Sequence, residues 1–250
     1  MTVLVTNDDG IESPGLEAMR VALSVEHDVW ILAPDGERSA MSHYITIKDP
    51  IRCRQLDERI FACSGSPADC VILSQLGGLP VKPDVVVAGV NIGPNLGTDI
   101  IYSGTVAAAR QAAFMGVPGI AVSINTYVPP FHLQPVTDFV VSHLSELCLL
   151  WNSRHLININ GPNIDGDELP ARITYPSWRV YEDDLVRFDS PQGDRFFFLH
   201  GKPAEVDLEE GSDWHAVENG AISVSPIYLN PIDHHEDEAY QNALFLKAEV

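Results

Sequence analysis

Short apolar runs alternate with amphipathic segments along the first 160 residues of the chain. The runs are too short for helices, and the first three have no polar residue at their centres, which is typical of buried parallel strands. Between the runs, apolar residues recur at spacings of three and four, which is typical of helices with one buried face. The predicted strands lie at residues 3–6, 28–34, 84–90, 119–124 and 155–160, and the predicted helices at 14–25, 67–76, 106–113 and 136–151.

This alternation predicts an α/β fold, a Rossmann-like three-layer sandwich with a mostly parallel central sheet over residues 1–160. A length of 250 residues suits one domain with a full core, so we expect a single domain over residues 1–250. After Gly161 the alternation ends, and residues 161–250 are expected to form an antiparallel extension and a C-terminal arm. Further strand-like segments lie at residues 44–47 and 51–61, predicted to form a hairpin, and at 172–175, 195–200 and 221–226.

The first predicted strand ends abruptly in Asn7-Asp8-Asp9-Gly10. Gly10 allows backbone angles that other residues resist, so the chain can turn there. Two adjacent carboxylates therefore follow the carboxyl end of a parallel strand, where open α/β sheets bind ligands. Carboxylates brought together by the turn repel one another unless a cation neutralises them. We favour a metal site here over an ordinary turn, which is the alternative explanation of this segment.

Two other loops follow predicted strands and bring oxygen ligands to the same edge of the sheet. Ser39 lies after the second strand, and Asn91 follows the third. With Asp8 and Asp9 they offer carboxylate, hydroxyl and amide oxygens, a set that suits Mg²⁺ or Mn²⁺. Such an ion polarises a phosphorus centre and lowers the pKa of a bound water, which becomes the nucleophile. We therefore interpret Asp8 and Asp9 as catalytic residues and all four as metal ligands.

A polar turn, Ser103-Gly104-Thr105, precedes the alanine-rich helix predicted from residue 106. Free N–H groups at a helix start, with two hydroxyl groups beside them, can bind an anion such as a phosphate. Taken alone, an ordinary N-cap is the simpler explanation of this turn. The alanine content also predicts that the helix packs closely on the sheet.

The charge of the chain narrows the choice of partners. A net charge of −20 and a pI of about 4.6 argue against long nucleic acids, which bind through lysine and arginine. A small anionic substrate is compatible with that charge if a metal or helix N-termini supply local positive potential. The chain has no apolar stretch of about eighteen residues and no signal-peptide pattern, so we expect no membrane partner and a cytoplasmic location. The four cysteines lack metal-site spacing and are predicted to be free thiols: Cys53, Cys63, Cys70 and Cys148.

Five segments between residues 3 and 123 carry the most specific pattern in the chain. They are Asn7-Asp8-Asp9-Gly10 with Pro14-Gly15, Arg38-Ser39, Gly65-Ser66-Pro67-Ala68-Asp69-Cys70-Val71, Gly89-Val90-Asn91 through Gly97, and Tyr102-Ser103-Gly104-Thr105-Val106. In this order they resemble the SurE family, the survival-protein 5′/3′-nucleotidases. The resemblance implies a phosphatase of nucleoside monophosphates that uses one divalent metal ion per subunit, Mg²⁺ or Mn²⁺.

The resemblance also implies roles for individual residues. The family's metal ligands fall on the four residues already selected at the strand ends: Asp8, Asp9, Ser39 and Asn91. The matching motifs on the phosphate side of the site contain Asn95, Ser103, Gly104 and Thr105.

The second half of the chain matches the family less closely. Residues 158–162 carry a glycine where the family usually continues Asn-Val-Pro, and residues 219–226 carry alanine in place of a tyrosine. In the family the hairpin and the tail build subunit contacts and the rim of the pocket, so the resemblance implies a homodimer or homotetramer that forms through the C-terminal arm. The apolar segments at 221–224, 227–229 and 243–246 also suggest an arm that is buried against a neighbouring subunit.

Other functions remain open on the sequence. A phosphatase that forms a phospho-aspartate would have Asp-x-Asp after the first strand, whereas this chain has Asn7-Asp8-Asp9. A nucleotide-sensing module would keep every ligand without turnover, and a glycosyltransferase would need a sugar-nucleotide domain that is not evident. His43 lies in a loop near the predicted site, where a structural role is as well supported as a catalytic one. His234-His235 is interpreted as a solvated surface segment.

Overall fold

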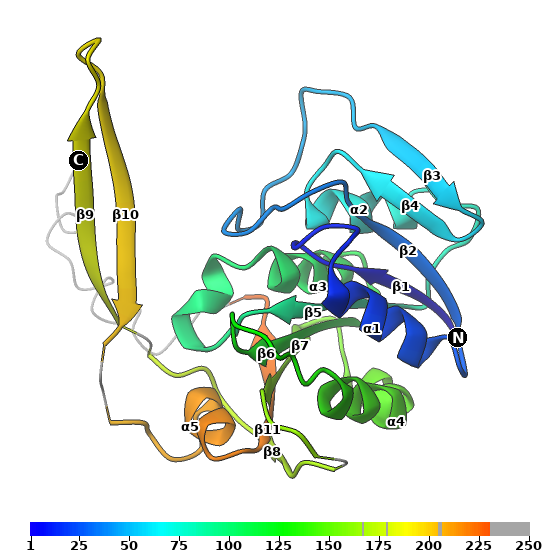
Figure 1. Cartoon of the computed structure of the whole chain (residues 1–250). Helices are drawn as coiled ribbons and strands as arrows, with labels where there is room; N and C mark the ends of the chain where they lie inside the picture. The colour runs from blue at the N-terminus through cyan, green and yellow to red at the C-terminus, as the bar shows by residue number, and fades with distance from the viewer. Residues whose placement is uncertain (167, 179, 205–206, 231–250) are drawn as a thin grey trace, which may run out of the picture.

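A nine-stranded sheet forms the centre of the molecule, within the residues that the structure describes, 1–166, 168–178, 180–204 and 207–230 (Figure 1). The structure is a computed structural model. In chain order the strands of this sheet are β1 (Thr2–Thr6), β2 (Asp28–Pro34), β3 (Cys53–Asp57), β4 (Ile60–Cys63), β5 (Val85–Ile92), β6 (Gly119–Asn125), β7 (His155–Pro162), β8 (Ala171–Ile173) and β11 (Ile222–Tyr228). Across the sheet the order is β3-β4-β2-β1-β5-β6-β7-β11-β8.

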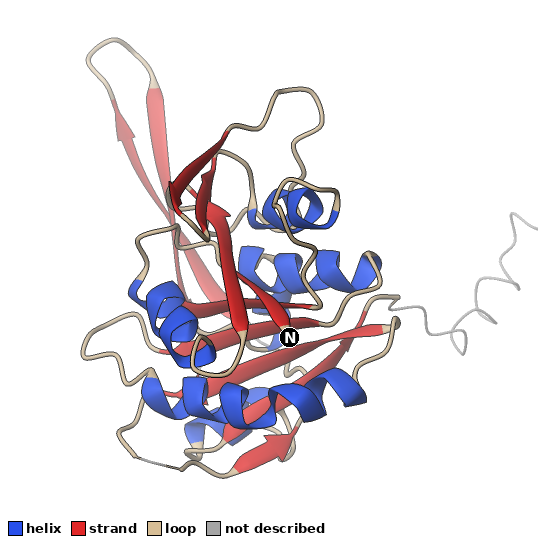
Figure 2. Ribbon diagram, turned by 90° about the vertical axis from the view of Figure 1, so that its right-hand side faces the viewer, coloured by secondary structure: helices blue, strands red, loops and turns tan. Residues whose placement is uncertain are grey.

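Helices cover both faces of this sheet and make the predicted three-layer sandwich (Figure 2). Helices α1 (Pro14–Leu23) and α4 (Gln134–Leu150) pack on one face, and α2 (Pro67–Gln75) and α3 (Gly104–Phe114) on the other. The side chains of β1 alternate between the two layers, since Val3 and Val5 join the first core and Leu4 joins the second. Both cores are apolar because the central strands carry apolar side chains on both faces. The predicted fold class is therefore confirmed.

The strand order places β2 and β5 on either side of β1, and all three run parallel. The chain leaves β1 toward β2 and later returns on the other side as β5. At such a reversal the loops after neighbouring strands separate and leave a crevice at the carboxyl ends. The loops predicted to carry the site therefore share one edge of the sheet.

The second half differs in part from its prediction. The predicted strand at 221–226 lies inside the main sheet as β11, antiparallel to β7, and Ile222 is buried there. The apolar segments at 221–224 and 227–229 thus pack within the chain itself and need no neighbouring subunit, whereas 243–246 lies outside the described residues. The segment at 172–175 became β8, which pairs parallel with β11, and no strand forms at 44–47.

A long two-stranded hairpin, β9 (Tyr181–Asp189) with β10 (Arg195–Pro203), projects away from the sheet (Figure 1). The sequence predicted the second of these strands at 195–200 but left the first as loop. Both strands are largely exposed, so β9 lacks the pattern of buried positions that identified the strands of the core.

Helix α3 packs closely on the sheet, as its alanine content predicts. Ala108, Ala109 and Ala112 are all buried. A Cβ atom built on Gly119 of β6 would lie 2.0 Å from the carbonyl oxygen of Ala109. Because the obstacle is backbone rather than a flexible side chain, only glycine permits this spacing between helix and strand.

We expect Gly119→Ala to lower the free energy of unfolding by about 3 kcal/mol, because an inserted methyl group must push α3 away from β6. Urea unfolding followed by circular dichroism measures this change. Gly166→Ala is the matched control, since its Cβ would lie 3.6 Å from the Leu169 side chain, an ordinary contact. The control should stay within about 0.5 kcal/mol of the parent. Equal stabilities of the two variants would contradict the close packing of α3.

Candidate active site

The turn after β1 is closed by the side chain of Asn7. Its Nδ2 donates to the carbonyl oxygen of Gly10 at 2.9 Å, and its Oδ1 accepts from the Gly10 N–H at 3.2 Å. Gly10 has a φ of +100°, and a Cβ there would lie 3.0 Å from the backbone of Gly36. The turn is therefore fixed by a buried amide and by a glycine, and it holds the two following carboxylates at the end of the strand.

Asp8 is buried at the start of helix α3. Its Oδ2 accepts from the Gly104 N–H at 3.1 Å, and its Oδ1 accepts a short hydrogen bond from the Thr105 hydroxyl. Burial raises the pKa of Asp8, whereas these hydrogen bonds oppose the rise. The Gly104 N–H, which the sequence analysis considered as a donor to a phosphate, thus donates to a carboxylate of the chain itself. Ser103 is the N-cap, with its Oγ accepting from the Val106 N–H at 3.0 Å.

Asp9 lies at the start of a different helix, α1. Its Oδ2 is 3.4 Å from the hydroxyl of Ser13, the N-cap of α1, and accepts from the Ile92 N–H at 3.2 Å. Burial, followed by repulsion from Asp8, raises the pKa of Asp9 to about 6. Two adjacent carboxylates therefore lie in one partly buried place, each beside a helix start.

Asn91 and Ser39 complete the set predicted from the strand ends. The Asn91 amide donates to the Gly93 carbonyl at 2.7 Å, and its Oδ1 lies 3.5 Å from the Thr105 hydroxyl, beside Asp8. Ser39 is exposed, and both its hydroxyl and its N–H donate to Oε1 of Glu37.

The turn after β1 and the loop that carries Ser39 meet beside one cavity of about 290 Å³. The Arg38 N–H donates to the carbonyl oxygen of Asp8 at 2.7 Å, which ties the Ser39 loop to the β1 turn. The predicted residues that line the cavity are Asp8, Ser39, Asn91, Asn95 and Ser103.

Asn95 is held by buried polar groups that the sequence did not identify as functional. Its N–H donates to Oδ1 of Asn160 at 2.8 Å, and its carbonyl oxygen accepts from the side chains of Asn158 and Asn160. Its Nδ2 lies 2.7 Å from the Ser123 hydroxyl. Two asparagines two positions apart in a buried strand point to the same face, and this spacing is the signal that could have identified them.

The outer wall of the cavity is aromatic. Tyr102, Tyr127 and Tyr181 line it together with Asp99. The Tyr181 hydroxyl lies 2.8 Å from both oxygens of Asp99, which joins the root of β9 to the 3₁₀ helix η1 (Gly97–Ile101). His43 instead contacts helix α3, with Nε2 2.9 Å from Oε1 of Gln111, and burial lowers the pKa of His43. These contacts give His43 a structural role.

The donor set fits a hard divalent cation. Within the described residues, no lysine or arginine forms an ion pair with Asp8 or Asp9, so a bound cation would neutralise two crowded carboxylates. The same part of the chain contains no cluster of three or more histidine, cysteine, aspartate or glutamate side chains placed for a metal. Further ligands for such an ion would be neutral oxygens, and the side chains of Ser39 and Asn91 on the cavity wall carry oxygens of that kind.

Comparisons with known proteins agree with this architecture. The family model described as "Survival protein SurE" matches residues 3–183. A "5'-nucleotidase SurE" of Geobacter sulfurreducens is 41% identical over 233 residues, covering 92% of this chain and 88% of that protein. One of Geotalea daltonii is 38% identical over 240 residues, covering 92% and 94%. The crystal structure of a SurE protein from Aquifex aeolicus superposes with a TM-score of 0.84 at 32% identity and covers 99% of this chain and all of that one.

We expect the contribution of Asp9 to the stability of the metal-free protein to fall as the pH rises from about 4 to about 6. In the folded protein Asp9 keeps its proton up to about pH 6, whereas an unfolded chain releases it near 3.8. The folded state therefore binds more protons in this range, and the free energy of unfolding decreases with pH. A shift of about two pH units corresponds to about 3 kcal/mol.

Denaturant unfolding in chelator, from pH 4 to pH 7, measures this effect as the difference between the parent and Asp9→Asn. The variant should lose the Asp9 component of the slope, whereas Asp138→Asn, exposed on α4, should keep the slope of the parent. Identical slopes for the parent and Asp9→Asn would contradict the raised pKa of Asp9.

Proposed function

The chain belongs to the survival protein SurE family, and from this premise we propose that it is a 5′-nucleotidase. It hydrolyses nucleoside 5′-monophosphates to nucleoside and phosphate, and a panel of mononucleotides tests whether 3′-monophosphates are substrates too. The observation that carries the proposal is the pair of crowded carboxylates, Asp8 and Asp9, at the carboxyl end of β1 beside a cavity with room for a small ligand.

We assign Asp8, Asp9, Ser39 and Asn91 as ligands of one divalent ion, Mg²⁺ or Mn²⁺. When bound, the ion polarises the phosphorus centre and lowers the pKa of a water molecule. Gly104 and Thr105 act on Asp8, since their hydrogen bonds hold the carboxylate in one orientation and oppose its protonation. Ser39 must turn from Glu37 to bind the ion, which its exposed position on the loop allows.

Asn95 and Ser103 lie on the cavity wall and are assigned to the phosphate side. The Asn95 Nδ2 donates one hydrogen to the Ser123 hydroxyl at 2.7 Å, and its second hydrogen is the one that we assign to a phosphate oxygen. The rings of Tyr102, Tyr127 and Tyr181 offer the wall on which the nucleoside packs.

The phospho-aspartate alternative requires a carboxylate oxygen free to attack phosphorus. Both oxygens of Asp8 already accept hydrogen bonds, from Gly104 and Thr105, and one oxygen of Asp9 accepts from Ile92. Attack on phosphorus would pull an oxygen away from these partners, whereas a metal ion can bind a second lone pair of the oxygen where it lies. Direct attack by water keeps these hydrogen bonds in place and is the mechanism that we propose. A nucleotide-sensing module would bind the same metal and nucleotide but would not hydrolyse the nucleotide.

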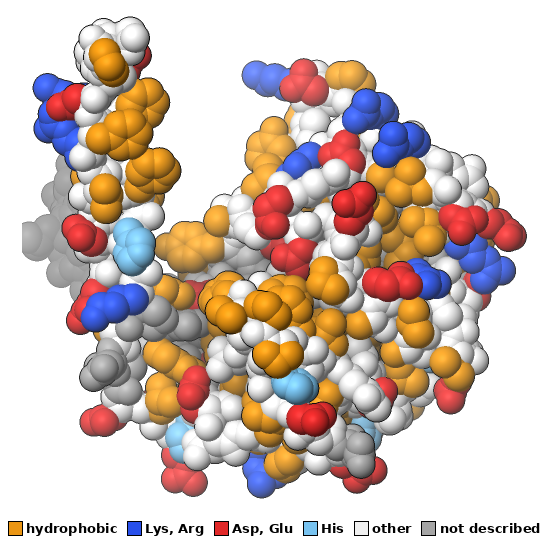
Figure 3. Space-filling model, viewed as in Figure 1, with side chains coloured by type: hydrophobic (Ala, Val, Ile, Leu, Met, Phe, Trp, Pro, Cys, Tyr) orange, Lys and Arg blue, Asp and Glu red, His pale blue; other side chains and the backbone are white. Residues whose placement is uncertain are grey.

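The partner surface that we propose is the hairpin β9–β10, which would join subunits into a homodimer or homotetramer. Phe188 stacks on Phe196 and Phe198, with ring centroids 5.0 and 5.8 Å apart, and all three rings remain about half exposed. Apolar side chains gather along this hairpin in Figure 3. A lone two-stranded hairpin is marginally stable in water, so burial against another copy would stabilise it. The C-terminal arm expected from the sequence lies largely in residues 231–250, outside the described part.

We propose a cytoplasmic location. Its support is the set of four cysteines, all free in the structure, which a reducing compartment would maintain. Separately, none of the helices in the described residues combines the length and the apolar character needed to cross a bilayer.

The first test is phosphate release from a panel of 5′- and 3′-mononucleotides, with Mg²⁺, Mn²⁺ or chelator. Asp8→Asn should lower kcat/KM on the order of 1,000-fold, because it removes a full charge worth several kcal/mol from the metal site. Ser39→Ala should lower it by about 10-fold, since water can replace a hydroxyl ligand, and Asn91→Ala should fall between the two. Asp138→Asn is the matched control and should keep the activity of the parent.

Three outcomes of this experiment would contradict the proposal. Full activity in chelator would exclude the metal, and no release from any mononucleotide would favour the sensing module. With labelled substrate and an acid quench, label that stays on the parent protein would replace direct attack by water with a phospho-aspartate.

For the assembly, light scattering should give a mass of two or four times 27.4 kDa at micromolar concentration. A charged substitution in the hairpin, Phe198→Glu, should shift the protein toward monomer, because it places a charge within the apolar contact. Leu76→Glu, at an exposed position beyond α2, is the matched control and should leave the mass unchanged. A parent protein that is monomeric at this concentration would contradict the interface.

A further inference from the structure

Three of the four cysteines gather at one end of the sheet. Cys53 lies on the edge strand β3, Cys63 on β4, and Cys70 on helix α2. Cys63 and Cys70 are fully buried, whereas Cys53 is exposed. The thiol of Cys63 contacts both of the others. The cluster therefore has one member that solvent reaches and a buried member directly behind it.

The register of the two strands favours a bond between Cys53 and Cys63. These residues are paired directly across the antiparallel ladder. In the next pair, the Ser64 N–H donates to the Arg52 carbonyl at 2.9 Å, so the cysteines occupy the non-hydrogen-bonded pair. At such pairs the Cα atoms are about 4.5 Å apart and the side chains approach most closely. That spacing falls within the range of about 4.4 to 6.8 Å that disulfides adopt.

We propose that Cys53 and Cys63 are a redox-modification site that forms a reversible cross-strand disulfide when a hydroperoxide reaches Cys53. Hydrogen peroxide is the simplest such oxidant. In the first step the Cys53 sulfur attacks one peroxide oxygen, the O–O bond breaks, and sulfenic acid and one water are formed. In the second step the Cys63 thiolate attacks the Cys53 sulfur, the S–O bond breaks, and a second water leaves. Two thiols thus lose two electrons and two protons, and one peroxide becomes two waters.

The surroundings of Cys53 and Cys63 give the two thiols different roles in these steps. Hydrogen bonds from the Cys70 thiol and from the Gly65 N–H, at 3.3 Å, lower the pKa of Cys63 to about 7, so it supplies the resolving thiolate. Although Cys53 is exposed, partial desolvation beside Cys63 and the charge of the Cys63 thiolate raise its pKa to about 11, which makes its reaction with peroxide slow. The site therefore responds to a sustained oxidant load rather than to a brief exposure.

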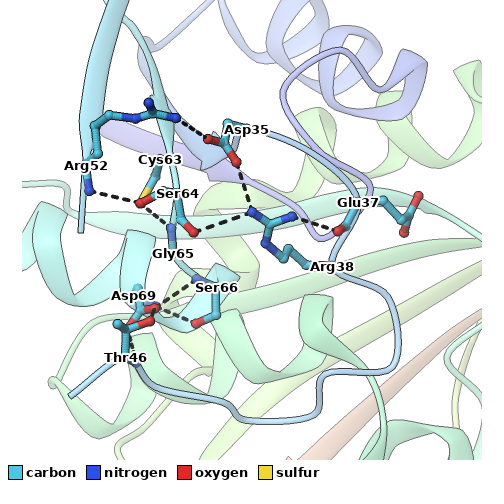
Figure 4. A network of polar contacts seen from close by, with 10 residues as sticks. All are labelled: Asp35, Glu37, Arg38, Thr46, Arg52, Cys63, Ser64, Gly65, Ser66 and Asp69. Carbon is cyan, nitrogen blue, oxygen red and sulfur yellow. Dashed lines mark hydrogen bonds and ion pairs between the residues drawn. The ribbon is translucent and has the colours of Figure 1, made fainter. Parts of the chain in front are cut away.

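The disulfide would lie one residue from a polar network that leads to the active site (Figure 4). Arg52 and Arg38 both pair with Asp35, at 3.2 and 2.9 Å. Arg38 also donates to the Ser64 carbonyl at 3.4 Å, and its N–H donates to the carbonyl of Asp8. Closing the bond would fasten the edge strand β3 beside the loop that carries Ser39.

Oxidation of the full chain with hydrogen peroxide, followed by mass spectrometry, tests this proposal. The intact mass should fall by about 2 Da, and peptide mapping should show Cys53 joined to Cys63. Dithiothreitol should restore the original mass. Cys53→Ser should abolish the bond, and because Cys53 is exposed this variant should fold. Cys148→Ser, in the fourth cysteine outside the cluster, is the matched control and should form the bond as the parent does.

Other products would overturn the proposal. These are a bond between Cys63 and Cys70, a disulfide between two chains through Cys53, or a parent protein that gains oxygen without forming the cross-strand bond. An unchanged mass after prolonged exposure would overturn it as well. The measurement follows the thiols alone, so its result does not depend on whether the protein hydrolyses nucleotides.

Discussion

Two carboxylates at the starts of two helices determine how the centre of this molecule is built. Asp8 accepts from the Gly104 N–H at the start of α3, and Asp9 lies beside Ser13 at the start of α1. The turn after β1 thereby draws together two helices on opposite faces of the sheet. A carboxylate at a helix start is stabilised by unpaired N–H groups and by the helix dipole. That stabilisation does not offset burial, since the pKa of both groups is raised.

The close approaches around these carboxylates explain the glycines of the site. A Cβ on Gly104 would lie 2.8 Å from Cβ of Asp8, and one on Gly15 would lie 1.9 Å from the carbonyl oxygen of Val90. Both glycines occur in the motifs that identified the family, so those motifs record packing constraints as well as chemistry. A methyl group on Gly104 would push against Asp8, and one on Gly15 would push the start of α1 away from Val90 of β5.

The central fold follows from local patterns in the sequence. The strands β1, β2 and β5 are apolar on both faces, so their composition predicts that they are buried on both sides of a parallel sheet. The hairpin is different, because β9 contains charged residues and is exposed along its length. Strand β9 has no alternation of buried and exposed positions, so only its pairing with β10 identifies it as a strand. The pairing of β11 with β7 could not be predicted from local patterns either, since it joins segments separated by 60 residues or more.

The site was predictable to the same depth. Neighbouring parallel strands end at one edge, so Asp8, Asp9 and Asn91 could be brought together without knowledge of any contact. The hydrogen-bond partners of each side chain could not be predicted from the sequence. The engagement of Gly104 by Asp8, the contact of Ser39 with Glu37 and the support of Asn95 by Asn160 depend on the register of distant segments.

The charges around the site constrain what it can hold. The chain carries a net charge of −20, Asp8 lines the cavity, and the charges of Asp8 and Glu37 both act on Asp9 beside it. A phosphate monoester would approach the cavity against repulsion, and the Gly104 N–H that could receive it already binds Asp8. Arg38, the nearest loop arginine, pairs with Asp35 instead. A bound cation would supply the missing positive charge, because a cation reverses the local potential that the carboxylates create. The same carboxylates that repel the phosphate in the absence of the ion attract the ion that draws the phosphate in.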